Sequence, residues 1–248
     1  MRGVVLAGGV GSRLGYLGGL LPKSMVPVQG HPLLWYALRS LAAMDASEVT
    51  VAALAPSETV VRYLRRLSPS ELGISRLKVH LLRAPTTSPV ATLREAVGGY
   101  SGEIGVALGD GFVIARNLSD FPRELHRRGA AVGQTVAWEN DRRVLRRTCE
   151  VRLARDGRML SIREKPSSPT PGYRGCGTYL FGEGELRSLY RDAIERGPVT
   201  SMTDLIGAGV RRKSAIGFRL KGWDINVNTV GDLISAWGRV PSSLSEAL

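Results

Sequence analysis

Short apolar runs alternate with helix-like stretches over the first 110 residues of the chain. Apolar runs of about four to eight residues are typical of buried strands, and apolar residues spaced three and four apart indicate helices. This β-α-β-α alternation predicts a parallel, doubly wound sheet that binds ligands at the carboxyl ends of its strands. The predicted strands are Gly3–Ala7, Val49–Leu54, Leu77–Leu82 and Ile104–Leu108, and the predicted helices are His31–Met44, Ser57–Leu67 and Pro89–Val97.

After Gly109 the pattern changes to strand-like runs separated by turns. One such turn is Ala154-Arg155-Asp156-Gly157, and a proline-rich stretch at 165–172 is expected to be a mobile loop. The second half should therefore add antiparallel strands and a substrate lobe to the sheet. The predicted strands are Val132–Trp138, Val151–Ala154, Met159–Glu164, Thr178–Phe181 and Ile216–Leu220, and the predicted helices are Gly184–Glu195 and Met202–Arg211.

The composition fits a globular protein of one sizeable domain. The chain has 248 residues, of which 43% are hydrophobic, and this length is enough to bury a large core. No apolar run approaches the ~20 residues of a membrane span. The strand-like start, Met1 to Ala7, is unlike a signal peptide. We therefore expect a cytoplasmic protein without membrane contact.

The formal net charge is +12, from 34 Lys and Arg against 22 Asp and Glu. Such an excess suits nucleic acid, a small anionic substrate or a solvated surface. Arginine clusters are spread along the chain without the interleaved aromatic residues of a single-strand binding platform, so a solvated surface is favoured and no nucleic acid partner is expected. Cys149 and Cys176 lack the spacing of metal ligands, which argues against zinc and leaves one disulfide open.

The segment after the first predicted strand, Gly8–Leu14, is rich in glycine. Its backbone N–H groups would point into the crevice at the end of the strand, where a phosphate chain would lie. It lacks the Gly-Lys-Ser/Thr of a Walker loop, and the second strand lacks the terminal acid of a dinucleotide fold. The first acidic residue of the chain is Asp45, whereas Arg13 and Lys23 supply cations suited to a polyanion. The alternative is a simple turn with solvated cations.

The segment Gly8–Val28 resembles the N-terminal signature of the sugar-phosphate nucleotidyltransferases, GGxGTRLxPLTxxxPKxMxPV, without a gap. This family includes the glucose-1-phosphate thymidylyltransferases and the UTP-glucose-1-phosphate uridylyltransferases. Ser12 replaces the usual threonine, while Gly15, Gly18 and Gly19 depart from the commoner polar residues. The resemblance implies a Rossmann-like α/β fold with a doubly wound mixed sheet, to which antiparallel strands add a sugar-binding lobe.

The resemblance also implies how the chain is divided. One domain, 1–248, would hold a nucleotide-binding half at 1–110 and a sugar-phosphate-binding half at 111–248. Arg13, Lys23 and Lys165 would be the catalytic residues. The residues implied to bind the nucleotide are Leu6, Ala7, Gly8, Gly9, Gly11, Ser12, Arg13, Ser88 and Gly109.

Two further stretches resemble the metal-binding elements of this family. Leu108-Gly109-Asp110-Gly111 resembles the LGD element, whose aspartate binds magnesium. A carboxylate at the lip of a phosphate crevice is costly unless a cation neutralises it, although an Asp opening a turn is the simpler alternative. Trp223–Leu233 resembles the closing W-x-D-[IV]-x-T-P-E-D-L element. Alignment on Thr229 favours Asn226 as the second metal ligand, and alignment nearer Trp223 favours Asp224; Thr229 would in either case cap the last helix.

The sugar-phosphate site is implied by two weaker motifs. Arg163-Glu164-Lys165-Pro166 resembles the EKP element, in which the lysine contacts the sugar phosphate and the glutamate orients sugar hydroxyls. Gly175–Phe181 resembles the GxYxF strand, where Gly177 would let a pyranose approach the backbone. The base-recognition stretch Arg83–Leu93 departs from the family pattern and leaves the nucleobase open. Ser88 lies where a glycine usually meets the base, and a helix cap by Ser88 is an equal alternative.

The implied reaction is a Mg²⁺-dependent in-line attack of a sugar 1-phosphate on the α-phosphorus of a nucleoside triphosphate, giving an NDP-sugar and pyrophosphate. Three alternatives stay open. The chain could be a non-catalytic nucleotide-binding regulatory homologue, a cytidylyltransferase acting on a polyol phosphate such as inositol phosphate, or a nucleic-acid-binding protein that uses the net charge. The sugar, any feedback site and the oligomeric state, including a homo-oligomer, are not determined by the sequence.

Overall fold

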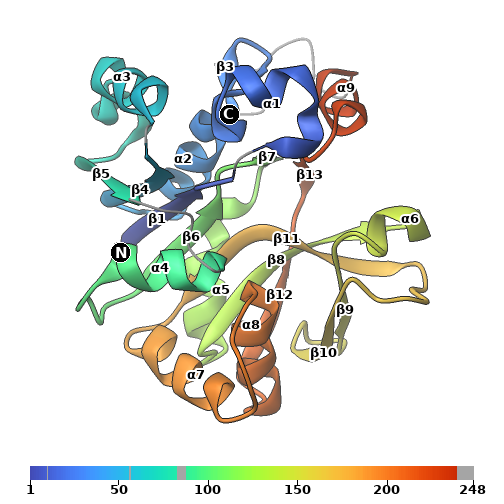
Figure 1. Ribbon diagram of the computed structural model, residues 1–248. Helices are drawn as coiled ribbons and strands as arrows, with labels where there is room; N and C mark the ends of the chain where they lie inside the picture. Colours follow the sequence, from blue (N-terminus) through green and yellow to red (C-terminus); the bar gives the residue numbers. More distant parts are fainter. Residues whose placement is uncertain (10, 56, 83–87, 239–248) are drawn as a thin grey trace.

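A computed structural model describes residues 1–9, 11–55, 57–82 and 88–238. Nine strands form one mixed sheet whose main path runs β10-β9-β11-β6-β1-β4-β5, with β8 joining β11 and β12 joining β8 (Figure 1). The first-half strands β1, β4, β5 and β6 are parallel, as predicted. Their bounds are β1 Arg2–Ala7, β4 Glu48–Leu54, β5 Arg76–Leu82 and β6 Ile104–Leu108.

The second half adds antiparallel strands, as the sequence predicted. β11 runs antiparallel to β6, β8 and β9, and β9 forms a hairpin with β10. β11 starts at Gly172, before the predicted Thr178, because a stretch with three glycines and Arg174 is held extended by pairing with β8 and β9. The bounds are β8 Val132–Glu139, β9 Cys149–Leu153, β10 Met159–Glu164, β11 Gly172–Phe181 and β12 Ala215–Arg219.

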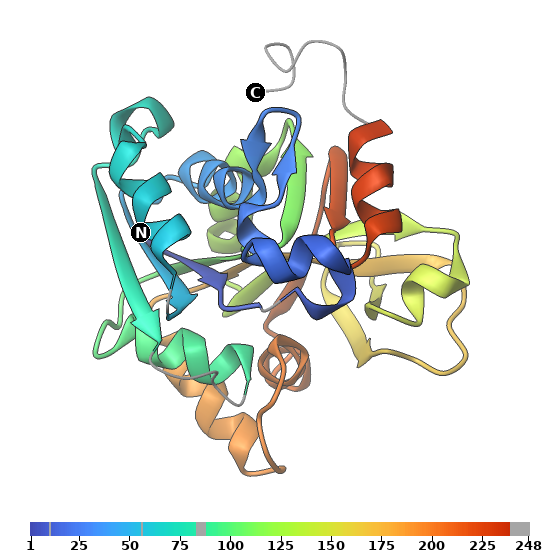
Figure 2. The same cartoon turned by 45° about the horizontal axis from the view of Figure 1, so that its top comes forward.

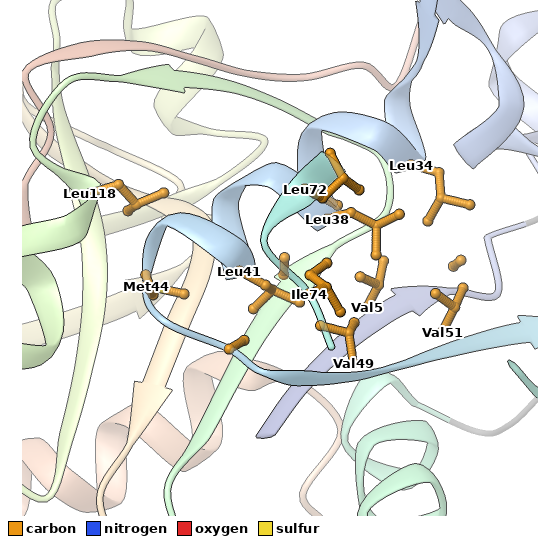
Figure 3. Close-up of a cluster of buried hydrophobic side chains, with 14 of the residues drawn as sticks. Val5, Leu34, Leu38, Leu41, Met44, Val49, Val51, Leu72, Ile74 and Leu118 are labelled. Atoms are coloured by element: carbon orange, nitrogen blue, oxygen red, sulfur yellow. The ribbon is translucent and has the colours of Figure 1, made fainter. Parts of the chain in front are cut away.

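Helices cover both faces of the sheet. Leu34, Leu38 and Leu41 of α2 point toward β1 and β4 on one face, as Figure 3 shows. On the other face, α4, α7 and α8 bury their apolar residues against β6 and β8. The helices predicted in both halves are therefore present. Their bounds are α2 Leu33–Ala43, α3 Glu58–Arg66, α4 Pro89–Val97, α7 Glu185–Ile194 and α8 Met202–Arg211.

The helix predicted from His31 begins two residues later. Pro32 disfavours the helical conformation of the residue before it, and His31–Pro32 instead form the short strand β3, which pairs with β2 (Pro27–Val28). The hydrophobic pattern did not predict the remaining elements, of which only the last helix was expected, from its Thr229 cap. They are β7 Gly111–Ala115, β13 Gly222–Asn226, α1 Tyr16–Leu20, α5 Phe121–Arg127, α6 Arg142–Leu145, α9 Val230–Gly238, and the 3-10 turns η1 Ser12–Leu14, η2 Lys23–Met25, η3 Pro69–Leu72 and η4 Leu118–Asp120.

β7 and β13 form a separate antiparallel pair that carries the C-terminal part of the chain back to the end of β1. In both Figure 1 and Figure 2, α9 lies beside α1, whereas α7 and α8 lie on the opposite side of the sheet. The two cysteines, Cys149 and Cys176, are buried and free, so the disulfide that the sequence left open is not formed. Within the described residues, no helix is long and apolar enough to cross a membrane.

Candidate active site

The glycine loop leaves the carboxyl end of β1 and turns into η1. Gly11 has a φ of 68°, a left-handed conformation that favours glycine. The amides of Gly9 and Gly11 donate no hydrogen bond to any residue that the structure describes. The aliphatic stem of Lys23 lies against both glycines, because a Cβ added to Gly9 or Gly11 would lie 3.7 or 3.5 Å from it. The loop thus presents free backbone donors next to a lysine, as an anion cradle requires.

Three distant parts of the sequence meet at Lys23. Its Nζ forms an ion pair with Asp110, which follows β6, and donates a 2.7 Å hydrogen bond to the Oδ1 of Asn228, which follows β13. The guanidinium of Arg13 donates to the same Asn228 Oδ1 at 3.4 Å. Lys23 is 8% exposed, so its charge is largely removed from water. We call Arg13, Lys23, Asp110 and Asn228 the loop cluster.

An apolar cluster beneath the loop explains why these residues meet. Leu14 of the glycine loop, Phe112 of β7, Val227 after β13 and Leu233 of α9 are all buried in it. Each of the first three is next to, or two residues from, a member of the loop cluster. Burial of these apolar residues packs the chain segments against one another and so brings the neighbouring polar side chains together at the crevice.

Asn226 and Asp224 lie on β13 but have different neighbours. Asn226 pairs in register with Gly111, next to Asp110, and its Oδ1 is buried with no hydrogen-bond partner among the described residues. Asp224 is buried and forms an ion pair with Arg174 of β11, which also donates to the Asp224 carbonyl. Asp110 is also paired with a cation, Lys23, but its side chain is 27% exposed, whereas the Asp224 side chain is completely buried and out of reach of a metal ion.

Asp110 of the loop cluster and the neighbouring Asn226 have the chemistry of a magnesium site that is completed by substrate. No group of three or more His, Cys, Asp and Glu side chains in the described part of the chain could hold a metal ion. Mg²⁺ is commonly bound by one or two carboxylates together with phosphate oxygens and water. The Asp110 carboxylate and the unpartnered Oδ1 of Asn226 are oxygen donors of this kind. The residues present therefore fit Mg²⁺ better than a metal that prefers nitrogen or sulfur ligands.

Glu164 is the last residue of β10, and Lys165 follows it. Neither residue takes part in the described hydrogen bonds of the loop cluster. The Glu164 carboxylate accepts a 2.6 Å hydrogen bond from the hydroxyl of Thr203. Lys165 is exposed and has a φ of 41°, a strained conformation for a residue with a Cβ. The proline-rich loop after it is tied down at Thr170, whose amide and hydroxyl donate to the buried Glu150.

Three other candidate residues have clear structural roles. A Cβ on Gly177 would lie 3.2 Å from Leu108, so glycine permits close packing of β11 on β6. The Gly109 amide donates to the carbonyl of Leu6 at 2.9 Å and ties the end of β6 to β1. Ser88 caps α4, accepting a 3.1 Å hydrogen bond from the Ala91 amide, which matches the alternative interpretation of that residue. Residues 83–87 of the base-recognition stretch lie outside the described residues.

Sequence reasoning missed two residues of this region. The closing element predicts Asn226 and Asp224 as metal ligands and gives no role to Asn228. The position of Asn228, two residues after Asn226 and directly before the helix cap Thr229, is the signal that could have indicated it. Thr229 does cap α9, through reciprocal hydrogen bonds with Asp232. No sequence motif indicated Arg174, because its partner Asp224 lies 50 residues later in the chain and meets it only where β13 contacts β11.

A depression of about 530 Å³ lies elsewhere, at the amino end of β1. Its lining includes Met1, Glu103 and His126, and none of the candidate site residues. The side chains of His126 and Glu103 are hydrogen-bonded to each other there. We therefore place the candidate site at the loop cluster and not in this depression.

Comparison with known proteins identifies the family. Residues 2–237 match the nucleotidyl transferase family model. A glucose-1-phosphate thymidylyltransferase of Actinoplanes sp. is 31% identical over 84% of this chain and 72% of its own length. The CMP-5'-(3-aminopropyl)phosphonate synthase of Streptomyces rubellomurinus is 31% identical over 79% of this chain and 30% of its own length.

The fold has a close structural counterpart. A crystal structure from Bacillus anthracis, assigned as a glucose-1-phosphate thymidylyltransferase in complex with a sucrose, aligns with a TM-score of 0.80. The alignment covers 98% of this chain and 97% of that one, at 20% sequence identity. The predicted Rossmann-like α/β fold with a mixed sheet and added antiparallel strands is confirmed.

Proposed function

Because the chain belongs to the nucleotidyl transferase family, we propose that it transfers a nucleotidyl group from a nucleoside triphosphate to a sugar 1-phosphate and releases pyrophosphate. Family membership makes the protein a nucleotidyltransferase. Its similarity to glucose-1-phosphate thymidylyltransferases supports the sugar 1-phosphate as acceptor. The observation that carries the proposal is the loop cluster, in which Lys23 contacts Asp110 and Asn228 beside the glycine loop.

In the proposed reaction, an oxygen of the sugar 1-phosphate forms a bond to the α-phosphorus, and the bond from that phosphorus to the pyrophosphate breaks on the opposite side. Both reactants are anions, so the protein must neutralise charge and align the groups. Arg13 and the free amides of Gly9 and Gly11 would bind the β- and γ-phosphates. Lys23 would place its charge at the reacting phosphates.

Asp110 and Asn226 would hold Mg²⁺, with the triphosphate completing its ligands. When bound, the ion supplies charge neutralisation at the reacting phosphate and fixes its orientation. Asn226 and Asp224 each have a buried Oδ1 without a hydrogen-bond partner among the described residues. The register of Asn226 with Gly111, next to Asp110, supports Asn226, because the Asp224 side chain is completely buried against Arg174.

Lys165 and Glu164 are the proposed contacts of the acceptor. The strained backbone of Lys165 holds its ammonium on an exposed turn, and such strain is most often retained where a side chain has a task. Thr203 fixes the Glu164 carboxylate by a hydrogen bond, which leaves its other oxygen to accept from a sugar hydroxyl. Gly177 has a packing role toward Leu108 that is sufficient to explain it.

The proposal is tested by measuring pyrophosphate release over a matrix of nucleoside triphosphates against sugar 1-phosphates and polyol phosphates, with Mg²⁺. We expect turnover with at least one sugar 1-phosphate and loss of turnover when EDTA replaces the metal. A folded protein that releases no pyrophosphate anywhere in the matrix would be a non-catalytic homologue.

A second candidate is cytidylyl transfer to an acceptor that is not a sugar. The similarity to the Streptomyces phosphonate synthase favours it, and a 50-residue stretch is 46% identical to a 2-C-methyl-D-erythritol 4-phosphate cytidylyltransferase of Cupriavidus pinatubonensis. The same matrix separates the two candidates, since this one requires CTP together with a polyol phosphate or a phosphonate.

A further inference from the structure

Asn228 is the one acceptor that joins the two cations of the glycine-loop region in the described structure. Its Oδ1 accepts from Lys23 Nζ at 2.7 Å and from the Arg13 guanidinium at 3.4 Å. These cations lie ten residues apart in the Gly8–Val28 segment, and their one shared hydrogen-bond acceptor in the described structure is Asn228. We propose that Asn228 is a positioning residue that holds Arg13 and Lys23 together for the triphosphate. This inference rests on the proposed function.

The backbone around Asn228 is fixed, which makes it suited to position other groups. Its amide donates to the Asp232 carboxylate at 3.0 Å, within the capping arrangement that begins α9. The next residue toward the N-terminus, Val227, is completely buried, and its amide donates to the carbonyl of Asp110 at 3.0 Å. The side-chain oxygen of Asn228 is therefore presented by a segment anchored to both α9 and the end of β6.

The chemical identity of the side chain matters because an amide is neutral. An amide oxygen accepts hydrogen bonds from both cations without cancelling their charge. The cluster already holds one carboxylate, Asp110, against Lys23. A second carboxylate at position 228 would pair with Arg13 and Lys23 and leave less positive charge for the phosphates. Asn228 thus holds both cations in place without reducing the positive charge that they offer to the phosphates.

The two ways in which Asn228 could matter are separated by two substitutions. Asn228→Asp keeps an acceptor oxygen in place and adds a negative charge, whereas Asn228→Ala removes the acceptor and adds no charge. If neutrality matters, the aspartate variant binds triphosphate more weakly than the alanine variant, because it repels the anion. If only an acceptor were needed to hold the loop, the aspartate variant would match the wild type.

The experiment uses the triphosphate that gives the highest turnover of the wild-type protein. We expect Asn228→Ala to raise its KM about tenfold and Asn228→Asp to raise it about a hundredfold, with smaller changes in kcat. Isothermal titration of the same triphosphate in EDTA should give the same order of affinity without metal. The matched control is Asn117→Ala, which removes an asparagine between β7 and η4 that bonds to the Arg219 carbonyl and the Lys221 amide and makes no described hydrogen bond to the loop cluster.

The failure of this inference is distinct from the failure of the proposed function. If wild-type protein turns over no triphosphate, the proposed function is wrong. If wild-type protein is active, and both Asn228 variants keep KM and kcat within twofold, the positioning role is wrong. An aspartate variant that binds as well as wild type, while the alanine variant binds weakly, would keep the positioning role and overturn the requirement for a neutral side chain, since any acceptor at position 228 would then suffice.

Discussion

Replacing Lys23 with methionine removes the ammonium of the loop cluster and keeps most of the side-chain stem. The stem lies against Gly9 and Gly11, and the side chain is 10% exposed, so Lys23→Met preserves the packing of the loop. The charge that disappears contacts both Asp110 and Asn228. The substitution therefore separates the electrostatic contribution of Lys23 from its contribution to the shape of the loop.

The structure gives an estimate for both effects. The Asp110 side chain is 27% exposed, so water partly replaces the lost ion pair and the free energy of unfolding should fall by only about 1 kcal/mol. For a domain of this size, that corresponds to a fall in Tm of about 2–4 °C. A cation at the reacting phosphates contributes about 3–4 kcal/mol to transition-state stabilisation, so kcat should fall about 10²–10³-fold.

The assay measures initial rates of pyrophosphate release at saturating substrates, together with thermal unfolding of each variant. Lys23→Arg serves as the control that keeps the charge but replaces a compact ammonium with a planar fork. A methionine variant with kcat within threefold of wild type would remove Lys23 from the mechanism. A loss of Tm greater than about 10 °C would show that Lys23 acts mainly by holding the loop.

Three other predictions follow from the described contacts. Lys165→Gly relieves the φ of 41° and should be about 1 kcal/mol more stable to urea than Lys165→Ala, while both lose the same activity; equal stabilities would show that the backbone is not strained. Burial raises the pKa of Cys149 to about 11 and that of Cys176 above its ordinary value, so both thiols should resist a thiol reagent at pH 8 until the protein unfolds, and rapid labelling of native protein would contradict this. Hydrogen bonds from Arg127 and Arg128 lower the pKa of Glu124 to about 2, which stabilises the fold above the unfolded pKa of 4.5. Glu124→Gln should therefore lower the free energy of unfolding by about 1 kcal/mol at pH 7. This difference from wild type should shrink as the pH falls from about 4.5 toward 2, and a difference that does not change with pH would refute the role of the Glu124 charge.

The sequence predicted the strands and helices whose residues are buried on a regular pattern. β6, α4, β10 and α8 all match the predicted bounds. β7 and β13 escaped prediction for different reasons. The run at 111–115 directly follows Asp110, for which a turn was the simpler alternative, and the one buried residue of the segment 222–226 is Asp224, which gives no apolar strand signal. Strands that pair only with each other leave little periodic signal.

The residues of the site also fall into two groups: some are predicted from one continuous segment, and others depend on the pairing of strands far apart in the sequence. Arg13 and Lys23 were identified from one continuous segment whose spacing suits a phosphate cradle. Their common acceptor, Asn228, depends on the pairing of β13 with β7, which no local pattern specifies. The same is true of the ion pair between Arg174 and Asp224, since each side chain alone is an ordinary charged residue in a strand. Long-range pairing decides which of several polar residues face one another.

The pairing of β13 with β7 also determines when, during synthesis, the growing chain can first bind nucleotide. The strands of β1, β4 and β6 pair among themselves, so a growing chain can form this part of the sheet early. Asn228 leaves the ribosome roughly 6–24 s after Asp110, at ~5–20 residues per second. Until then Lys23 lacks its second partner, and the surface on which Leu14 packs is incomplete. A nascent chain should therefore not capture nucleotide before its last strand has been made.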